Sequence, residues 1–316
     1  MTQDELTNLF ASHIVERRKR FETGGRLVHY TSAESAYQII NGRQIWLRNA
    51  SMMNDFSEIE HGLRCLITAW ASEPGQKLQA MLNRVKEGLR DELAGLFDGH
   101  TDAIKRATYI ISLSEHDDNE DKLGRLSMWR AYGARAGVAM VLNNTAFAAT
   151  TDEMKVYSSP VFYHDFEQFG AWFASWVDKL LAAEAELSTI DPAILQWWMF
   201  YAFRSFALCT KHPGFAEERE WRVFYSPTFE GETEWVSQSV EIIGGIPQLV
   251  MKLSLHDDVQ KGISGVAPAK LFNRIIIGPC EHPIQVRAGI ASALTEAGVA
   301  EPLANMWMSF IPLRQS

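Results

Sequence analysis

The fold is decided by the stretch Lys211-His212-Pro213-Gly214-Phe215-Ala216-Glu217-Glu218-Arg219-Glu220-Trp221-Arg222-Val223-Phe224-Tyr225, in which a charged turn leads into an apolar, aromatic strand. Alternate side chains of a β-strand share a face. Trp221 and Val223 are therefore expected in the core. Glu218, Glu220 and Arg222 are expected together on the opposite face, at the mouth of a sheet.

Grouped carboxylates destabilise a fold unless a ligand or a reaction uses them. Two carboxylates beside a guanidinium suit a reacting centre that becomes cationic, such as an oxocarbenium-like sugar carbon. The alternative is an Arg-carboxylate ladder on a solvated strand, which needs no function.

Composition sets the class of the protein. The chain has 316 residues, of which 47% are hydrophobic, so it is long enough to bury a sizeable core. Its three cysteines are far apart and form no CxxC pair, which favours a reduced, cytoplasmic protein without disulfides. The net charge of -9 argues against a surface that binds nucleic acid throughout.

The chain starts with the polar, acidic residues Met-Thr-Gln-Asp-Glu-Leu and contains no run of about 18 apolar residues. We therefore expect neither a secretory signal nor a membrane partner. Several catalytic motifs are also missing, namely GxGxxG after a strand, GxxxxGK[ST], HExxH and GxSxG. Cys209 with His212 and Cys280 with His282 lack the paired spacing of a zinc site, so no metal is expected.

Helical and strand patterns alternate without a regular βαβ rhythm. Residues 57–71 and 76–97 and two aromatic-rich stretches, 166–187 and 193–209, are expected to be helical. Strands are expected at 26–31, 44–48, 106–114, 137–142 and 220–226. The pattern predicts a single α+β domain over 1–316 with a central, mostly antiparallel sheet flanked by helices, an N-terminal helix within 1–25 and a helical insertion at 164–210.

Polar residues collect at the ends of the expected strands. A strand-end histidine can bond a ribose hydroxyl, a tyrosine can stack on a planar ring, an arginine can clamp a diphosphate, and small hydroxyls leave room for a ligand. The candidate ligand-binding residues are His29, Tyr30, Thr31, Asn54, Ser112, Ser114 and Tyr132, and the candidate catalytic residues are Glu220, Glu218 and Arg48. Several also have a structural explanation, such as a satisfied core residue, whereas Asn54 is left without one.

The order of these segments resembles an uncharacterised bacterial family associated with abortive-infection phage defence. The matching motifs span residues 27–226 and are His29-Tyr30-Thr31, Asn54-Asp55-Phe56-Ser57-Glu58, Leu113-Ser114-Glu115, Met128-Trp129-Arg130-Ala131-Tyr132-Gly133, Gly137-Val138 and Glu218-Arg219-Glu220-Trp221-Arg222. The resemblance implies a defence or toxin effector and names no chemistry.

A more distant resemblance, to ADP-ribosyltransferases, implies a reaction. That family splits NAD in a sheet-lined cleft using a strand-one His or Arg, a Ser-x-Ser or Tyr, and a late Glu, often in Glu-x-Glu. His29, Ser112-Leu113-Ser114 and Glu218-Arg219-Glu220 follow this order, and Arg48 is similar to the second-strand Arg of DNA-targeting members. The chain mixes the His-led and Arg-Ser-led versions of the pattern.

The resemblance implies an ADP-ribosyltransferase-like core that uses NAD as a substrate and modifies a protein or nucleic-acid acceptor. An NAD glycohydrolase would need the same core. A non-catalytic sensor or interaction protein is the main alternative, with the 164–210 helices as its partner surface, and a nuclease is a third. The transferase hypothesis predicts that His29, Arg48, Ser114 and Glu220 converge on one cleft.

Overall fold

The computed structural model describes residues 1–22, 24–52, 57–147 and 152–312. These residues form two compact units. The helical unit comprises 1–19, 50–108 and 159–216, and the sheet unit comprises 20–49, 109–158 and 217–316. The third stretch of the helical unit contains the expected insertion at 164–210. Among the described residues, no helix combines the length and the apolar character that a membrane span requires.

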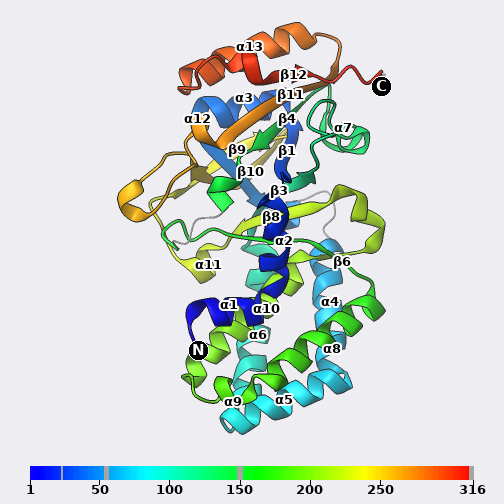
Figure 1. Cartoon of the computed structure of the whole chain (residues 1–316), viewed down its shortest axis with the longest axis vertical. Coiled ribbons are helices and arrows are strands. Elements are labelled where there is room, and N and C mark those ends of the chain that lie inside the picture. The colour runs from blue at the N-terminus through cyan, green and yellow to red at the C-terminus, as the bar shows by residue number, and fades with distance from the viewer. Residues whose placement is uncertain (23, 53–56, 148–151, 313–316) are drawn as a thin grey trace. The chain divides into compact units, whose positions relative to one another are not determined.

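The helical unit is built around α10, which is buried along most of its length and packs against α4 and α6. Figure 1 shows these helices in the lower part of the view. Its elements are α1 (Gln3–Phe10), most of α2 (Ser12–Glu22), η1 (Ala50–Met52), α4 (Ser57–Ala71), α5 (Glu73–Val85), α6 (Leu89–Arg106), β6 (Phe162–Tyr163), α8 (Phe166–Ala182), α9 (Glu184–Leu187), α10 (Pro192–Cys209), β7 (Thr210–Lys211) and most of η3 (Pro213–Glu218).

Gly62 explains how closely α4 approaches α10. A Cβ atom at this position would lie 2.2 Å from the carbonyl oxygen of Ala207, so only glycine allows the contact. The aromatic side chains expected on the 164–210 helices are mostly buried, including Phe169, Phe173 and Trp176. Phe166 and Trp197 have 41% and 48% of their surface exposed, and Trp172, Trp198 and Tyr201 are half-buried.

His13 is enclosed by aromatic rings of the helical unit and gives the unit a pH-dependent stability. Its ring centroid lies 4.5 Å from that of Phe162, and its Nε2 atom is buried without a hydrogen-bond partner among the described residues. Burial lowers the pKa of His13 from 6.5 to about 3. Between these pH values the unfolded chain binds a proton that the folded chain does not.

The stabilising effect of neutral His13 is therefore complete above pH 6.5 and is lost as the pH falls toward 3, by about 1.4 kcal/mol per pH unit. Urea unfolding of the wild type and of His13→Leu at pH 7 and pH 5 measures this loss. The wild type should lose about 2 kcal/mol more than the variant over this interval. Equal losses in the two proteins would show that His13 is protonated in the folded state.

The sheet unit contains a ten-stranded sheet in the order β12-β11-β4-β1-β3-β2-β10-β9, with β8 paired to β3 and β5 paired to β8. Among the described residues of this path, β11 and β12 form the one parallel pair. The expected mostly antiparallel sheet flanked by helices is thus confirmed. The strands are β1 (Arg26–Ser32), β2 (Gln44–Asn49), β3 (Tyr109–His116), β4 (Ala136–Leu142), β5 (Tyr157–Pro160), β8 (Glu220–Tyr225), β9 (Val236–Ile243), β10 (Ile246–Ser254), β11 (Phe272–Cys280) and β12 (Met306–Met308).

Helices cover both faces of this sheet. Figure 1 shows α7 on one side of β1 and β4 and α3 on the other. The helices and turns of this unit are α3 (Ala33–Gly42), α7 (Leu126–Tyr132), η2 (Asn144–Phe147), α11 (Pro227–Glu230), η4 (Val259–Lys261), α12 (Pro268–Leu271), α13 (Pro283–Glu296) and η5 (Pro302–Asn305). The strand β8 is buried at all six positions.

Trp129 anchors α7 to the sheet and explains the glycines around it. The indole is 3% exposed, and its Nε1 donates to the carbonyl of Leu123 at 2.9 Å. Cβ atoms at Gly124, Gly137 and Gly278 would lie within 2.6–3.1 Å of atoms of this ring or of neighbouring backbone. The Trp of the Met-Trp-x-x-Tyr segment and the glycine before Val138 therefore form one packing unit.

Candidate functional site

One face of the β3–β8 pair is polar although it is buried. Ser112 lies opposite Arg222, and Ser114 lies opposite Glu220 in the antiparallel register. Directly opposed residues point to the same side of a sheet, so these four side chains share a face. Trp221, which lies between Glu220 and Arg222, is 0% exposed on the other face. The expected alternation along this strand is confirmed.

Glu220 is the centre of this polar face. Its Oε1 accepts hydrogen bonds from Ser112 Oγ at 2.5 Å and Arg222 Nε at 2.9 Å, and its Oε2 accepts from Arg222 Nη2 at 3.2 Å. The Glu220 and Arg222 side chains are 5% and 3% exposed. The alternative of a ladder on a solvated strand is thus wrong, because the ion pair is buried. A buried carboxylate retains its charge only with such partners.

The alternation pattern had placed Glu218 on the strand, but Glu218 lies before it. It ends η3, and Arg219 follows in a left-handed conformation with φ of 44°, so the period-two pattern begins at Glu220. The Glu218 carbonyl accepts from Ser114 Oγ at 2.6 Å. Its carboxylate accepts a hydrogen bond from the Tyr132 hydroxyl at 3.4 Å. Two predicted site residues are thus in contact, through a hydrogen bond to each other instead of through a bound ligand.

Arg125 holds this turn in place and was not predicted. Its Nη1 donates to Ser114 Oγ at 3.0 Å and to the carbonyls of Glu217 and Glu218 at 2.7 and 3.2 Å, and its Nη2 donates to the Glu115 carbonyl at 2.7 Å. The guanidinium therefore ties the segment before β8 to the end of β3. The sequence offers little signal for it beyond a basic residue in a polar loop.

Arg48 lies on the same face of the sheet. Arg48 lies opposite Ile110 of β3, and Ile110 lies opposite Phe224 of β8. Ile110 is two residues from Ser112 on the same strand, so the Arg48 side chain lies on the same face as Ser112 and Glu220. Its Nη2 donates to Gln248 Oε1 at 3.2 Å. Partial burial lowers the pKa of Arg48, although a guanidinium stays charged at neutral pH. Arg48, Ser112, Ser114 and Glu220 thus share one face of the neighbouring strands β2, β3 and β8.

His29 and Thr31 lie on the opposite face. Val28 opposes Ser114, so alternation directs Val28 toward the Glu220 side and His29 away from it. The expectation that His29 and Glu220 line the same face is therefore wrong. The His29 ring still reaches the backbone of β3, since its Nδ1 donates to the Ser112 carbonyl at 3.1 Å. Burial lowers the pKa of His29, and this hydrogen bond partly opposes the effect.

That contact occurs at a fork in the sheet. On one edge of β3, β1 pairs with residues 114–116 and β2 pairs with residues 109–110. Residues 111–113 of β3 lie between the segment paired with β1 and the segment paired with β2, and β1 and β2 diverge beside these three residues. The opposite edge of β3 is paired with β8 over residues 109–114. Ser112 therefore has its hydroxyl on the Glu220 face and its carbonyl at the fork.

Tyr30 belongs to a buried network instead of an open stacking surface. Its hydroxyl accepts from the Arg125 backbone N–H at 2.8 Å and lies 2.6 Å from His116 Nε2. His116 Nδ1 lies 3.2 Å from Asp121 Oδ1, and Asp121 also pairs with Arg26 at 3.1 Å. Tyr30 is 5% exposed and its pKa is raised by burial. The phenol is thus a structural link between β1, β3 and the following loop.

Two further predictions concern Asn54 and metal binding. Asn54 lies outside the described residues, and its ligand role stays a prediction. Within 1–22, 24–52, 57–147 and 152–312, no group of three or more His, Cys, Asp or Glu side chains is arranged to hold a metal ion.

Residues 128–223 match the model of a family described as a protein of unknown function (DUF2971). The matched segment runs from α7 to β8 and so includes Tyr132, Glu218 and Glu220. No curated protein and no solved structure matches the chain.

Proposed function

We propose that this protein cleaves NAD at the nicotinamide–ribose bond and transfers the ADP-ribosyl group to a macromolecule. The observation that carries the proposal is the shared face of Arg48, Ser112, Ser114 and Glu220 on three neighbouring strands. This is the Arg-Ser-led version of the pattern seen in the sequence. The transferase hypothesis had predicted that His29 joins this face, and that part of the prediction is wrong, because His29 lies on the other face. The proposal therefore rests on the Arg-Ser-led residues alone.

The reaction assigns a role to each of these groups. The C–N glycosidic bond breaks, nicotinamide leaves with the bonding electron pair, and positive charge develops at the ribose carbon. Glu220 stabilises that charge, and its hydrogen bond from Ser112 fixes the orientation of the carboxylate. Arg48 binds the diphosphate. The acceptor attacks the ribose carbon and loses a proton, and water in this place would make the enzyme a glycohydrolase.

Binding of NAD must alter the ion pair that Glu220 forms with Arg222. Arg222 neutralises the carboxylate in this structure, and a positively charged ribose competes with that guanidinium for the same oxygens. Substrate binding must therefore separate Arg222 from Glu220 at least in part. The resemblance to phage-defence proteins supports an effector whose activity is restrained until infection, and a closed ion pair is compatible with such restraint.

The test is to incubate the purified full-length protein with NAD and to follow nicotinamide by chromatography. Release with ADP-ribose attached to added protein or nucleic acid supports the transferase, and release with free ADP-ribose supports the hydrolase. Intact NAD after prolonged incubation with a cell extract that supplies both acceptors and activators would contradict both.

A second candidate is a non-catalytic interaction protein. The observation that favours it is the pairing of Glu220 with Arg222 and Ser112 in a buried position, which is sufficient to explain all three residues structurally. A partner surface on the 164–210 helices would have to use the exposed Phe166 and Trp197, because most other aromatic residues there are buried. Alanine at both positions should then abolish partner binding, and neither the wild type nor the variant should consume NAD.

A further inference from the structure

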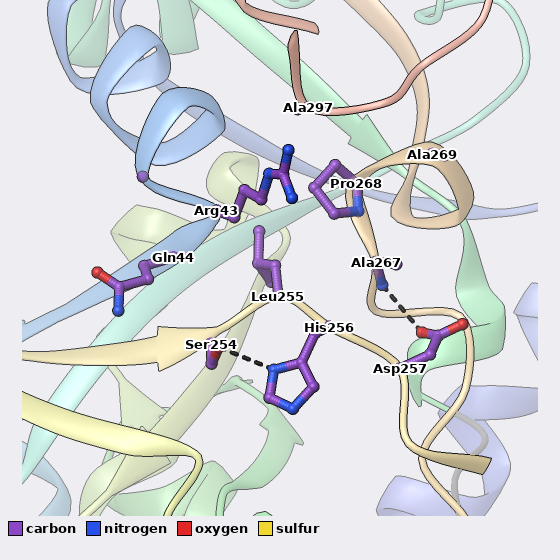
Figure 2. Close-up of a pocket in the computed structure, with 11 residues that line it drawn as sticks. Arg43, Gln44, Ser254, Leu255, His256, Asp257, Ala267, Pro268, Ala269 and Ala297 are labelled. Carbon is purple, nitrogen blue, oxygen red and sulfur yellow. Dashed lines mark hydrogen bonds between the residues drawn. The ribbon is translucent and has the colours of Figure 1, made fainter. Parts of the chain in front are cut away.

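The sheet unit contains a pocket of about 280 Å³ that the proposed reaction does not use. It is formed where the ends of α3, β10 and α13 meet the start of α12. Figure 2 shows the Arg43 side chain near Pro268 and Ala297, and the His256 ring on the opposite side of Leu255. The pocket therefore has a cationic end and an aromatic end separated by an apolar side chain.

Arg43 occupies a backbone position that favours glycine. It follows α3 in the left-handed region, with φ of 50° and ψ of 43°, whereas the neighbouring Gly42 ends the helix itself. A non-glycine side chain at such a position strains the backbone. One role of this side chain is structural, because Arg43 Nη2 donates to the Glu296 carbonyl at the end of α13 at 2.8 Å.

The remaining donors of Arg43 are available to a ligand. The structure describes no partner for Nε or Nη1 within 1–22, 24–52, 57–147 and 152–312. The carbonyl groups at the C-terminal ends of α3 and α13 beside this guanidinium already accept hydrogen bonds from Arg43. Glu296 O is bonded to the Arg43 side chain, and Ile39 O and Ile40 O are bonded to the Arg43 backbone N–H. The guanidinium can thus bind an oxyanion.

His256 forms a rigid platform at the other end. Its ring stacks on Trp235 with a centroid distance of 4.0 Å and an interplanar angle of 17°. A hydrogen bond of 2.9 Å between its Nδ1 and Ser254 Oγ fixes the ring's rotation. Trp235 is 1% exposed whereas His256 is exposed, so the imidazole presents its second face to solvent. A preorganised ring of this kind stacks on planar ligands.

The other charged group of the pocket is already compensated. Asp257 Oδ1 accepts from the backbone N–H groups of Val266 and Ala267 at 2.9 and 3.0 Å, and its Oδ2 pairs with Lys270 at 2.7 Å. Although burial opposes it, these donors lower the pKa of Asp257 to about 2. The carboxylate therefore serves to fix the loop at the start of α12 and does not repel an anion on its own.

We propose that this pocket binds a nucleoside monophosphate, with the base stacked on His256 and the phosphate bound by Arg43. The volume is that of a small ligand and lies just below the usual range of about 300–1,000 Å³ for drug-sized molecules. Leu255 and Pro268 supply the apolar wall for the sugar. The site is independent of the β3–β8 face, so the proposal holds whether or not the protein cleaves NAD.

Isothermal titration of the full-length protein with AMP tests the site, with adenosine and inorganic phosphate as separate titrants. AMP should bind at least about tenfold more tightly than either fragment, because it engages both ends of the pocket. Arg43→Gly should weaken AMP binding by about tenfold or more and leave adenosine unchanged. His256→Ala should weaken AMP and adenosine and leave phosphate unchanged.

Arg43→Gly is a favourable test variant, because glycine relaxes the left-handed backbone and offsets the lost bond to α13, so the protein should remain folded. Lys122→Ala removes an exposed cation from the same unit and should leave AMP binding unchanged. The proposal is overturned if AMP shows no saturable binding up to millimolar concentrations, if phosphate alone binds as tightly as AMP, or if Lys122→Ala weakens binding as much as Arg43→Gly.

Discussion

Glu220→Gln is expected to lower nicotinamide release from NAD by at least about a hundredfold, because the amide keeps the shape of the side chain and removes the charge that stabilises a ribosyl cation. The structure also predicts an effect on folding. Arg222 would be left buried beside a neutral group, and breaking such a pair from one side costs about 3–5 kcal/mol. Activity alone therefore does not separate catalysis from stability.

The double variant Glu220→Gln with Arg222→Met makes the separation. It replaces the ion pair by neutral side chains, which removes the buried charge that lost its ion pair with Glu220 and should restore most of the stability lost in the single variant. If Glu220 is catalytic, the double variant stays inactive although its stability is restored. If the double variant regains both its thermal midpoint and nicotinamide release, the Glu220 carboxylate contributes to stability and not to catalysis.

Local patterns predicted much of the architecture. The alternation of charged and aromatic residues identified β8 and its two faces, and α4 was predicted with its observed bounds of residues 57–71. The single helix expected at 76–97 is instead divided between α5 and α6, where Gly88 adopts φ of 82°. An isolated glycine does not reveal from sequence whether it interrupts a helix or is tolerated within it.

The parts of the site that sequence did not reveal depend on contacts between distant segments. Whether His29 faces Glu220 is decided by the pairing of Val28 with Ser114, and a shift of one residue would have reversed the answer. The position of Glu218 depends on the left-handed conformation of Arg219, which no local pattern requires. Arg125 is important only because the fold brings Ser114 and the Glu217–Glu218 carbonyls around it.

Trp221→Ala is expected to lower the free energy of unfolding by about 3–5 kcal/mol, as truncation of a large core aromatic does. The indole is fully buried and its ring centroid lies 5.2 Å from that of Phe21, so the substitution removes ring packing and leaves a cavity behind the polar face. Urea unfolding monitored by circular dichroism measures the loss.

Trp221→Phe is the matched control. The Trp221 Nε1 atom is buried without a hydrogen-bond partner among the described residues, so phenylalanine keeps a ring in the core and removes an unsatisfied donor. Its stability should lie much closer to that of the wild type than that of the alanine variant does. Because Glu220 and Arg222 flank this residue on the strand, the alanine variant should also disturb their geometry, whereas the phenylalanine variant should preserve it. Equal midpoints for the wild type and Trp221→Ala would contradict the packing of this side chain in the core.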